Sequence, residues 1–156
     1  MKAIRALTNN DVPRLIEFWN QYWGGDEMIV HGESFRPEQL NGFITEDWSG
    51  VITYYVKNDT CEIISLNSLK ENRGIGTALI DEVLQEARRQ NCRRLFLVTT
   101  NDNLHALGFY QRHGFELACI RRGAVDEARK IKPGIPATGL NNIPLRDEIE
   151  LEMSLT

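Results

Sequence analysis

Two short segments of this 156-residue chain hold residues whose types and spacing could carry chemistry. The first is the turn Glu71–Ala78, in which Gly74 and Gly76 stand between an apolar run and a helical pattern. A glycine turn that opens a helix presents backbone N–H groups and the positive end of the helix dipole, and this combination binds phosphate. Because glycine has no Cβ, a ligand can also approach the backbone closely. The turn therefore predicts a phosphate site.

This turn differs from two common phosphate-binding motifs. A P-loop needs a lysine and a hydroxyl residue after its second glycine, whereas Gly76 is followed by Thr77 and Ala78. A dinucleotide fold needs a third glycine three residues later, and none is present at that spacing. We expect neither site. Taken alone, the segment is also compatible with a helix that merely starts after a glycine turn.

The second segment is Asn101–Phe115, which follows the apolar run Leu95–Val98. A continuous apolar run of this length is typical of a buried parallel strand. Asn103 is a suitable N-cap for a helix over residues 104–113. Tyr110 would lie on that helix, and a tyrosine phenol placed beside a reacting group can donate a proton to it. The alternative is a core tyrosine whose hydroxyl is satisfied elsewhere.

Together the two segments resemble the signature of the GNAT superfamily of acyl-CoA-dependent N-acetyltransferases. In that family Gln/Arg-x-x-Gly-x-Gly/Ala follows the fourth strand, and Asn-x-x-Ala-x-x-x-Tyr followed by Gly-Phe comes later. This chain reads Glu71-x-x-Gly74-x-Gly76, then Asn103-x-x-Ala106-x-x-x-Tyr110 and Gly114-Phe115. The departure is Glu71, a carboxylate where the family usually has Gln or Arg, although Arg73 nearby could restore the charge balance.

The resemblance implies acetyl-CoA as co-substrate, bound mostly through backbone amides, and no metal. The family sheet splays between its fourth and fifth strands, and the pantetheine arm of CoA pairs there with the fourth strand. On this chain the implied cofactor-binding residues are Leu66, Asn67, Ser68, Glu71, Asn72, Arg73, Gly74, Ile75, Gly76, Thr77, Asn103, Ala106 and Tyr110.

Two side chains are candidates for proton transfer. By the resemblance, Tyr110 protonates the departing CoA thiolate. Glu62 starts the predicted fourth strand, with Ile64 and Leu66 on its own face, and could deprotonate the amine directly or through water. An exposed carboxylate at a strand end is the alternative for Glu62.

The sequence gives fewer indications of which residues line the pocket for the acceptor amine. Trp19, Tyr22 and Trp23 could wall it, or they could be core aromatics at helical spacing. His31 could touch the substrate. The segment Lys132–Leu145 contains three prolines and two glycines, so we expect an irregular, mobile loop that could cover the pocket.

The remaining chain supplies strands and helices in mixed order. We predict strands at Lys2–Leu7, Gly42–Glu46, Val51–Lys57, Cys61–Leu69, Arg94–Thr100, Glu116–Arg122 and Glu148–Leu155. Helices are predicted from Val12, at Arg36–Leu40, Ile75–Gln90, Leu104–His113 and Ala124–Lys130. This order indicates the α/β class in a mixed, α+β-like form. By the resemblance, residues 1–156 form a single GNAT-like domain with a splayed six- or seven-stranded mixed sheet flanked by helices.

Composition limits the alternatives. A net charge of −4 argues against nucleic-acid binding, and we expect a cytoplasmic protein without membrane contact. The odd number of cysteines fits neither a disulfide framework nor a zinc site, and Cys61 and Cys119 are expected to be buried thiols. The favoured function is N-acetyl transfer to an amine of a small molecule or protein. A CoA-binding sensor or interaction module without catalysis is the alternative, and a homodimer is left open.

Overall fold

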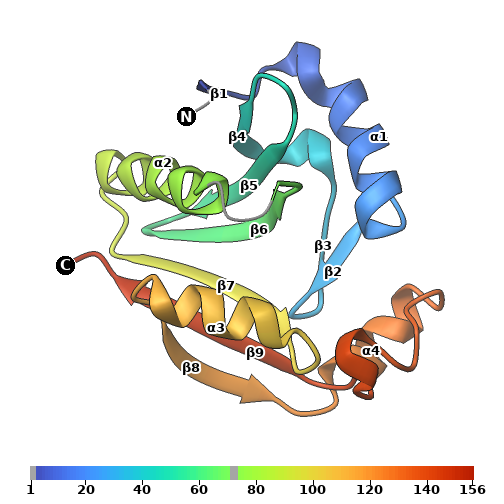
Figure 1. Ribbon diagram of the computed structural model, residues 1–156. Helices are drawn as coiled ribbons and strands as arrows, with labels where there is room; N and C mark the ends of the chain where they lie inside the picture. The colour runs from blue at the N-terminus through green and yellow to red at the C-terminus, as the bar shows by residue number, and fades with distance from the viewer. Residues whose placement is uncertain (1–2, 71–73) are drawn as a thin grey trace. The chain divides into compact units, whose positions relative to one another are not determined.

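The computed structural model describes residues 3–70 and 74–156 (Figure 1). Glu71, Asn72 and Arg73, three of the predicted cofactor-binding residues, lie outside the described residues. The helices are α1 (Val12–Trp23), α2 (Ile75–Arg89), α3 (Leu104–Arg112) and α4 (Ala124–Ile131). The strands are β1 (Ile4–Ala6), β2 (Met28–Val30), β3 (Glu33–Phe35), β4 (Asn41–Thr45), β5 (Gly50–Lys57), β6 (Thr60–Ser68), β7 (Arg94–Thr100), β8 (Glu116–Arg121) and β9 (Glu148–Ser154).

These elements confirm the predicted class, a mixed α/β fold with helices and a seven-stranded sheet. The chain divides into two compact units, one of residues 1–28, 35–95 and 154–156 and one of residues 29–34 and 96–153. The first unit contains the sheet strands β1, β4, β5 and β6, and most of β7, β8 and β9 belong to the second. Each unit is described by itself below.

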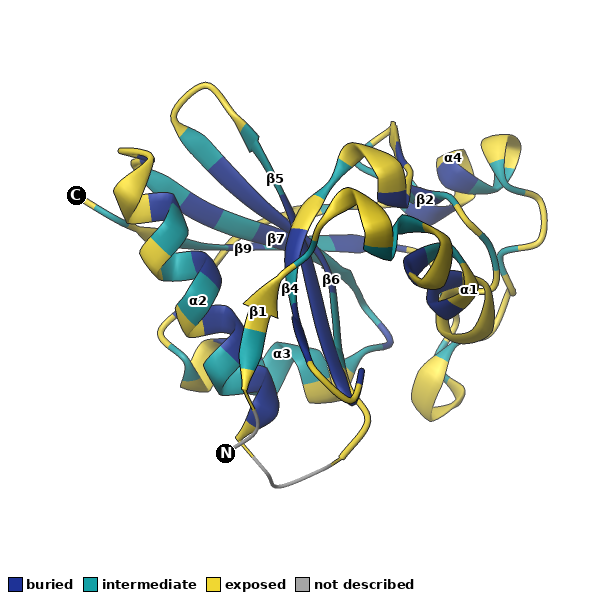
Figure 2. Ribbon diagram, turned by 90° about the horizontal axis from the view of Figure 1, so that it is seen from above, coloured by how far each residue is buried: buried dark blue, intermediate teal, exposed yellow. Residues whose placement is uncertain are grey.

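The first unit is an antiparallel sheet in the order β1-β4-β5-β6, with α2 packed on β4, β5 and β6. One face of α2 is buried, and its residues recur at helical spacing: Ile75, Gly76, Leu79, Ile80, Val83 and Ala87. Figure 2 shows this buried stripe on α2 and the long buried stretches of β5 and β6. The apolar core of this unit therefore lies between α2 and the sheet.

Local signals set the boundaries of the helices. Pro lies in the first turn of α1, and Gly24 ends the helix in the left-handed region at φ 74°. Gly74 precedes α2 at φ 68°, and Gly114 follows α3 at φ 92°. A glycine adopts this backbone without the steric cost that a Cβ brings. The predicted helices and strands consequently match the observed ones to within about two residues at most ends.

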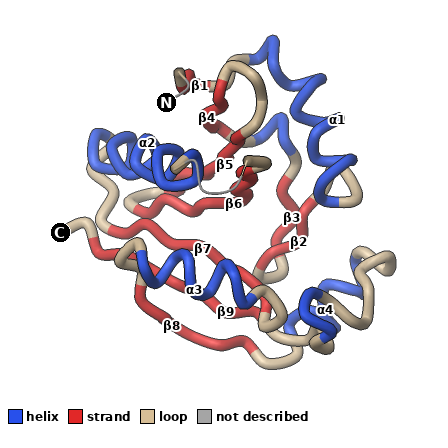
Figure 3. The backbone as a smooth tube through the Cα atoms, viewed as in Figure 1, coloured by secondary structure: helices blue, strands red, loops and turns tan. Residues whose placement is uncertain are grey.

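The second unit contains most of β7, β9 and β8, and β8 pairs antiparallel with β9 at the edge of the sheet. The helix α3 packs against β8. Leu97, Tyr110, Phe115 and Leu151 are buried and form its core. Loops make up much of the chain between α4 and β9, as Figure 3 shows.

The segment Lys132–Leu145 is mostly a loop, as expected, and its regular structure is limited to the 3₁₀ helix Leu140–Asn142 and a β-bridge between Thr138 and Pro144. Two features differ from the sequence expectations. The strands β2 and β3 were not predicted, and they meet at a turn in which His31 and Gly32 have φ of 42° and 80°. Cys119 is exposed rather than buried, whereas Cys61 is buried as expected. Cys119 lies on β8, the last strand in the sheet order of the described residues.

Within residues 3–70 and 74–156, no helix is both long and apolar enough to cross a membrane.

Candidate functional site

The N-terminus of α2 has the geometry expected of an anion site. Gly74 takes the left-handed conformation directly before Ile75, the first residue of the helix. The Ala78 N–H donates to the Gly74 carbonyl at 3.0 Å, a helical hydrogen bond that begins at the glycine before the helix. No acidic side chain lies in the first turn of α2, and Arg88 and Arg89 lie in its last. The helix dipole at this end can therefore stabilise a phosphate.

A β-bulge in β6 changes which residues share a face with Glu62. Ser65 pairs with Thr53 and Ile63 pairs with Tyr54, so the register skips Ile64. Because side chains alternate along a strand, this extra residue places Glu62 on the face of Ser65 and Asn67. The prediction that Glu62 shares a face with Ile64 and Leu66 is therefore wrong.

The environment of Glu62 also differs from the expected strand end. It is the third residue of β6, opposite Tyr55, and only 5% of its surface is exposed. On the same face, the hydroxyls of Thr53 and Ser65 are buried and hydrogen-bonded at 2.6 Å. Glu62 is therefore a buried carboxylate among polar groups, and the expected alternative of an exposed carboxylate at a strand end does not apply.

Asn67, in the predicted pantetheine-binding segment Leu66–Ser68, is hydrogen-bonded by a side chain from α1. The indole Nε1 of Trp23 donates a hydrogen bond of 2.8 Å to Oδ1 of Asn67. The three candidate aromatic residues of α1 differ in exposure. Trp19 is fully buried, whereas Tyr22 and Trp23 are 42% and 40% exposed. Trp19 is a core residue, and Tyr22 and Trp23 remain candidates for the wall of a pocket.

In the second unit, Asn103 caps α3 as the sequence predicts. Its Oδ1 accepts a hydrogen bond of 3.1 Å from the N–H of Ala106. This contact uses the oxygen of the amide and leaves its NH₂ group oriented by the cap. Asn103 can therefore cap the helix and donate to a ligand at the same time.

Tyr110 lies on α3 in an aromatic environment. Its ring meets those of Phe109 and Phe115 edge to face, with centroids at 5.3 and 5.5 Å. Only 7% of Tyr110 is exposed, and burial raises the pKa of its phenol well above the ordinary value. The Tyr110 phenol is consequently neutral throughout the physiological pH range.

The predicted site residues thus fall into two groups. The first unit contains Glu62, Leu66, Asn67, Ser68, Gly74, Ile75, Gly76 and Thr77. The second contains Asn103, Ala106 and Tyr110.

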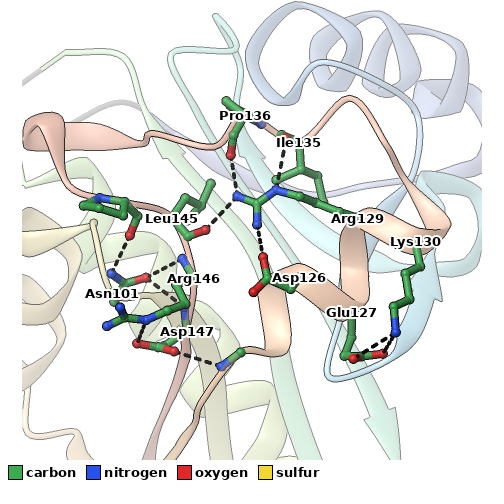
Figure 4. A network of polar contacts seen from close by, with 12 residues as sticks. Asn101, Asp126, Glu127, Arg129, Lys130, Ile135, Pro136, Leu145, Arg146 and Asp147 are labelled. Carbon is green, nitrogen blue, oxygen red and sulfur yellow. Dashed lines mark hydrogen bonds and ion pairs between the residues drawn. The ribbon is translucent and has the colours of Figure 1, made fainter.

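Sequence reasoning gave no role to Asn101 and Asp102, which anchor the loop 132–145. Asp102 is 4% exposed, and its carboxylate accepts a hydrogen bond from the Leu140 N–H at 2.8 Å. The amide of Asn101 donates to the Pro144 carbonyl at 2.8 Å and accepts from the Asp147 N–H at 2.9 Å (Figure 4). The available signal was the position of these polar residues at the carboxyl end of a buried strand.

Arg129 holds the same loop from α4. Its guanidinium donates to the carbonyls of Ile135, Pro136 and Leu145 at 3.3, 2.6 and 2.6 Å (Figure 4). Because one guanidinium binds three carbonyls of the same loop, it restrains the backbone of that loop. The loop is therefore attached at both of its ends.

Glu148, at the start of β9, holds the β2–β3 turn within the second unit. It is 4% exposed, and its carboxylate accepts from the His31 N–H at 3.1 Å. The Nε of Arg121 lies 3.4 Å from the same carboxylate. The backbone of His31, a candidate substrate contact, is thereby held in place.

Comparison with known proteins identifies the family. Residues 6–115 match the Acetyltransferase (GNAT) family. The chain belongs to this family. It is 42% identical over 149 residues to YdhI of Bacillus subtilis (strain 168), covering 92% of this chain and 93% of that protein, which is described as uncharacterized. YxbD of the same organism, also described as uncharacterized, is 42% identical over 142 residues, covering 88% and 89% of the two chains.

Solved structures of GNAT acetyltransferases share the fold. A Bacillus subtilis acetyltransferase in complex with CoA has a TM-score of 0.71 and 18% identity, with 100% of both chains covered. A GNAT family acetyltransferase from Elizabethkingia anophelis with acetyl-CoA bound has a TM-score of 0.69 and 23% identity, covering 98% of this chain and 97% of that one. The predicted GNAT fold is confirmed.

Proposed function

We propose that this GNAT protein transfers an acetyl group from acetyl-CoA to the primary amine of a small molecule or protein, by direct attack in a ternary complex. The observation that carries the proposal is Tyr110, a buried phenol on α3 at the tyrosine position of the family motif. A phenol carries its proton at neutral pH and can donate it to the departing thiolate, which takes up a proton as it leaves.

The acetyl-CoA contacts follow from the two groups of residues. The backbone at the N-terminus of α2 is proposed to bind the pyrophosphate, and Gly76 allows close approach to this backbone. The backbone of β6 at Leu66–Ser68 is proposed to pair with the pantetheine amides, as the family resemblance implies for the fourth strand of the splayed sheet. The NH₂ group of Asn103 supplies a further donor. The proposal also includes Glu71, Asn72 and Arg73 from the sequence motif.

The reaction needs no covalent enzyme intermediate. The amine nitrogen attacks the thioester carbonyl carbon, the C–N bond forms, and the C–S bond breaks. Tyr110 donates a proton to the sulfur, and Glu62, directly or through water, accepts the proton lost by the amine. Burial raises the pKa of Cys61 to about 12, so that thiol stays protonated and is a poor nucleophile. Positioning the amine against the thioester supplies much of the rate.

Two measurements test the proposal. Acetyl-CoA or CoA should raise the melting temperature, and a ligand at about 100 times its dissociation constant stabilises a folded protein by roughly 2.7 kcal/mol. Release of free CoA is then followed over a panel of small amines and peptides. CoA binding without release over the panel would favour the inactive CoA-binding module, and no melting shift at millimolar CoA would overturn the proposal.

A further inference from the structure

The edge strand β8 presents an unusual surface. Glu116, Leu117, Ala118, Cys119 and Ile120 are all exposed, and β9 is the only strand in the sheet order beside β8 among the described residues. Leu117 and Ile120 expose 56% and 63% of their surface. An open strand edge with apolar side chains is a template for pairing with another strand, and Lys, Pro and β-bulges are among the features that limit such pairing. Neither Lys nor Pro occurs in β8, and its bulge sets the register described next.

The register between β8 and β9 contains a β-bulge that sorts these side chains. Leu117 pairs with Leu151 and Cys119 pairs with Glu150, so the register skips Ala118. Side chains paired across two strands point to the same face. Leu117 and Ile120 therefore share the apolar face of Leu151, and Glu116, Cys119 and Arg121 share the opposite face with Glu148, Glu150 and Glu152.

The sequence of β8 is complementary to its own reverse. In an antiparallel alignment of two copies, Glu116 lies opposite Arg121, Leu117 opposite Ile120, and Ala118 opposite Cys119. A two-fold axis normal to a sheet keeps each side chain on its own face, so opposite residues must share a face. If side chains alternated strictly along β8, the two residues of each of these pairs would lie on opposite faces of the sheet. The bulge shifts the alternation by one position, so that Glu116 and Arg121 share one face and Leu117 and Ile120 share the other.

We propose that β8 is an interface at which a second copy of this chain pairs antiparallel through its own β8. The pairing is isologous, and it extends the sheet of one copy into that of the other. Each Leu117 then contacts Ile120 of the other copy, which removes four large, exposed apolar side chains from water.

The charged residues of β8 also favour a second copy of this chain as the pairing partner. In its own sheet Glu116 stands directly opposite Glu152, and like charges in that arrangement are destabilising. The second copy brings Arg121 to the free side of Glu116. Arg121 is already held on the correct face, because its Nη1 donates to Glu150 at 3.0 Å. An unrelated apolar peptide would not supply this counter-charge at the required position.

The interface is small. Six residues from each strand form it, less than the surface of standard stable complexes. We therefore expect a dissociation constant on the order of micromolar or weaker. The dimer should form reversibly as the protein concentration rises.

Sedimentation velocity over a concentration series tests the surface. The unmodified protein should shift from monomer to dimer, and Leu117→Lys should lower the association constant at least about tenfold, because it places a charge in the apolar face. The matched control is Leu140→Lys, which alters a side chain with the same 56% exposure away from β8 and should leave the association unchanged. A monomer at every concentration, or a dimer that Leu117→Lys leaves intact, would overturn the proposal.

Oxidation tests the register. In the proposed alignment the two Cys119 residues are diagonal neighbours on one face, with Cα atoms about 6 Å apart, which is within disulfide range. Mild oxidant should give a covalent dimer of the unmodified protein and not of Cys119→Ser, in which the buried Cys61 and Cys92 remain. Leu117→Lys should reduce the covalent dimer strongly. A Leu117→Lys variant that cross-links as fast as the unmodified protein would refute this register.

Discussion

The indole Nε1 of Trp23 and the side-chain oxygen of Asn67 are joined by a hydrogen bond of 2.8 Å, from the last residue of α1 to the end of β6. The two residues are 44 positions apart in the sequence. Trp23 is a candidate for the wall of the acceptor pocket, and Asn67 lies in the segment of β6 that is proposed to bind pantetheine. The bond therefore connects the two proposed binding surfaces of the first unit.

Breaking this bond should affect the acceptor more than acetyl-CoA, because pantetheine is expected to contact backbone rather than the Asn67 side chain. Trp23→Phe keeps an aromatic ring and removes the donor, and we expect the acceptor KM to rise about fivefold, equivalent to roughly 1 kcal/mol. A double-mutant cycle with Asn67→Ala should show a coupling of similar size. Tyr22→Phe, which removes neither partner of this bond, should show no coupling with Asn67→Ala and is the control for the cycle. Additive effects in the cycle would mean that the bond carries no binding energy.

The hydroxyl of Tyr110 is predicted to act in the chemical step. Tyr110→Phe preserves the packing against Phe109 and Phe115 and deletes only the proton donor. Single-turnover transfer should slow by about 10²- to 10⁴-fold, nearer the lower value because a thiolate of ordinary pKa near 8.5 can also leave unprotonated. Tyr54→Phe, at another buried tyrosine, should leave the rate unchanged. Equal rates for Tyr110→Phe and the unmodified protein would assign Tyr110 a structural role.

Gly76 is predicted to let the pyrophosphate reach the backbone of α2. Gly76→Val should remove the melting shift produced by CoA, because a branched side chain stands in the ligand's path. Gly134→Val is the control, since no atom lies within 4 Å of a Cβ added at Gly134. Circular dichroism checks that both variants fold. Normal CoA binding by a folded Gly76→Val would place the pyrophosphate elsewhere.

Local signals account for what the sequence predicted correctly. Asn103 and Gly74 act on the helices that they adjoin, and the alternation of Ile149, Leu151 and Met153 is contained within one strand. The errors concern relations between strands. A single unpaired residue, Ile64, reverses the face expected for Glu62, and no pattern within β6 reveals it. The register of the neighbouring strand decides it.

Distance along the chain explains the other omissions. Asp102 holds the backbone of Leu140 across 38 positions, and a proline-rich segment gives no sign of such a partner. The strands β2 and β3 are three residues each, too short for alternation to be visible, although the His31-Gly32 dipeptide is compatible with a tight hairpin turn. Sequence periodicity detects elements, whereas these features depend on contacts between elements.

Alkaline pH should destabilise the first unit through Tyr54. Burial raises the pKa of Tyr54 to about 12, from the ordinary 10.0. Between these values the folded chain keeps a proton that the unfolded chain releases, so the free energy of unfolding falls as pH rises. At about pH 11 this one group should cost roughly 1 kcal/mol relative to neutral pH. Urea unfolding should show a smaller alkaline loss for Tyr54→Phe, and an identical loss would contradict the assignment.

Arg129 and Lys130 are adjacent on α4 but should differ sharply in their effect on the loop 132–145. Arg129 binds three carbonyls of the loop region, whereas Lys130 forms only an exposed ion pair with Glu127 (Figure 4). Arg129→Met should therefore raise the rate of cleavage within the loop roughly 10- to 100-fold, and Lys130→Met should change it less than about twofold. The measurement is limited digestion with a protease of broad specificity, because trypsin would lose a cleavage site of its own in each variant. If acetyl-CoA and an acceptor slow cleavage of the Arg129→Met loop, the loop covers the acceptor; equal rates with and without ligands would leave the loop as a structural support for β9 alone.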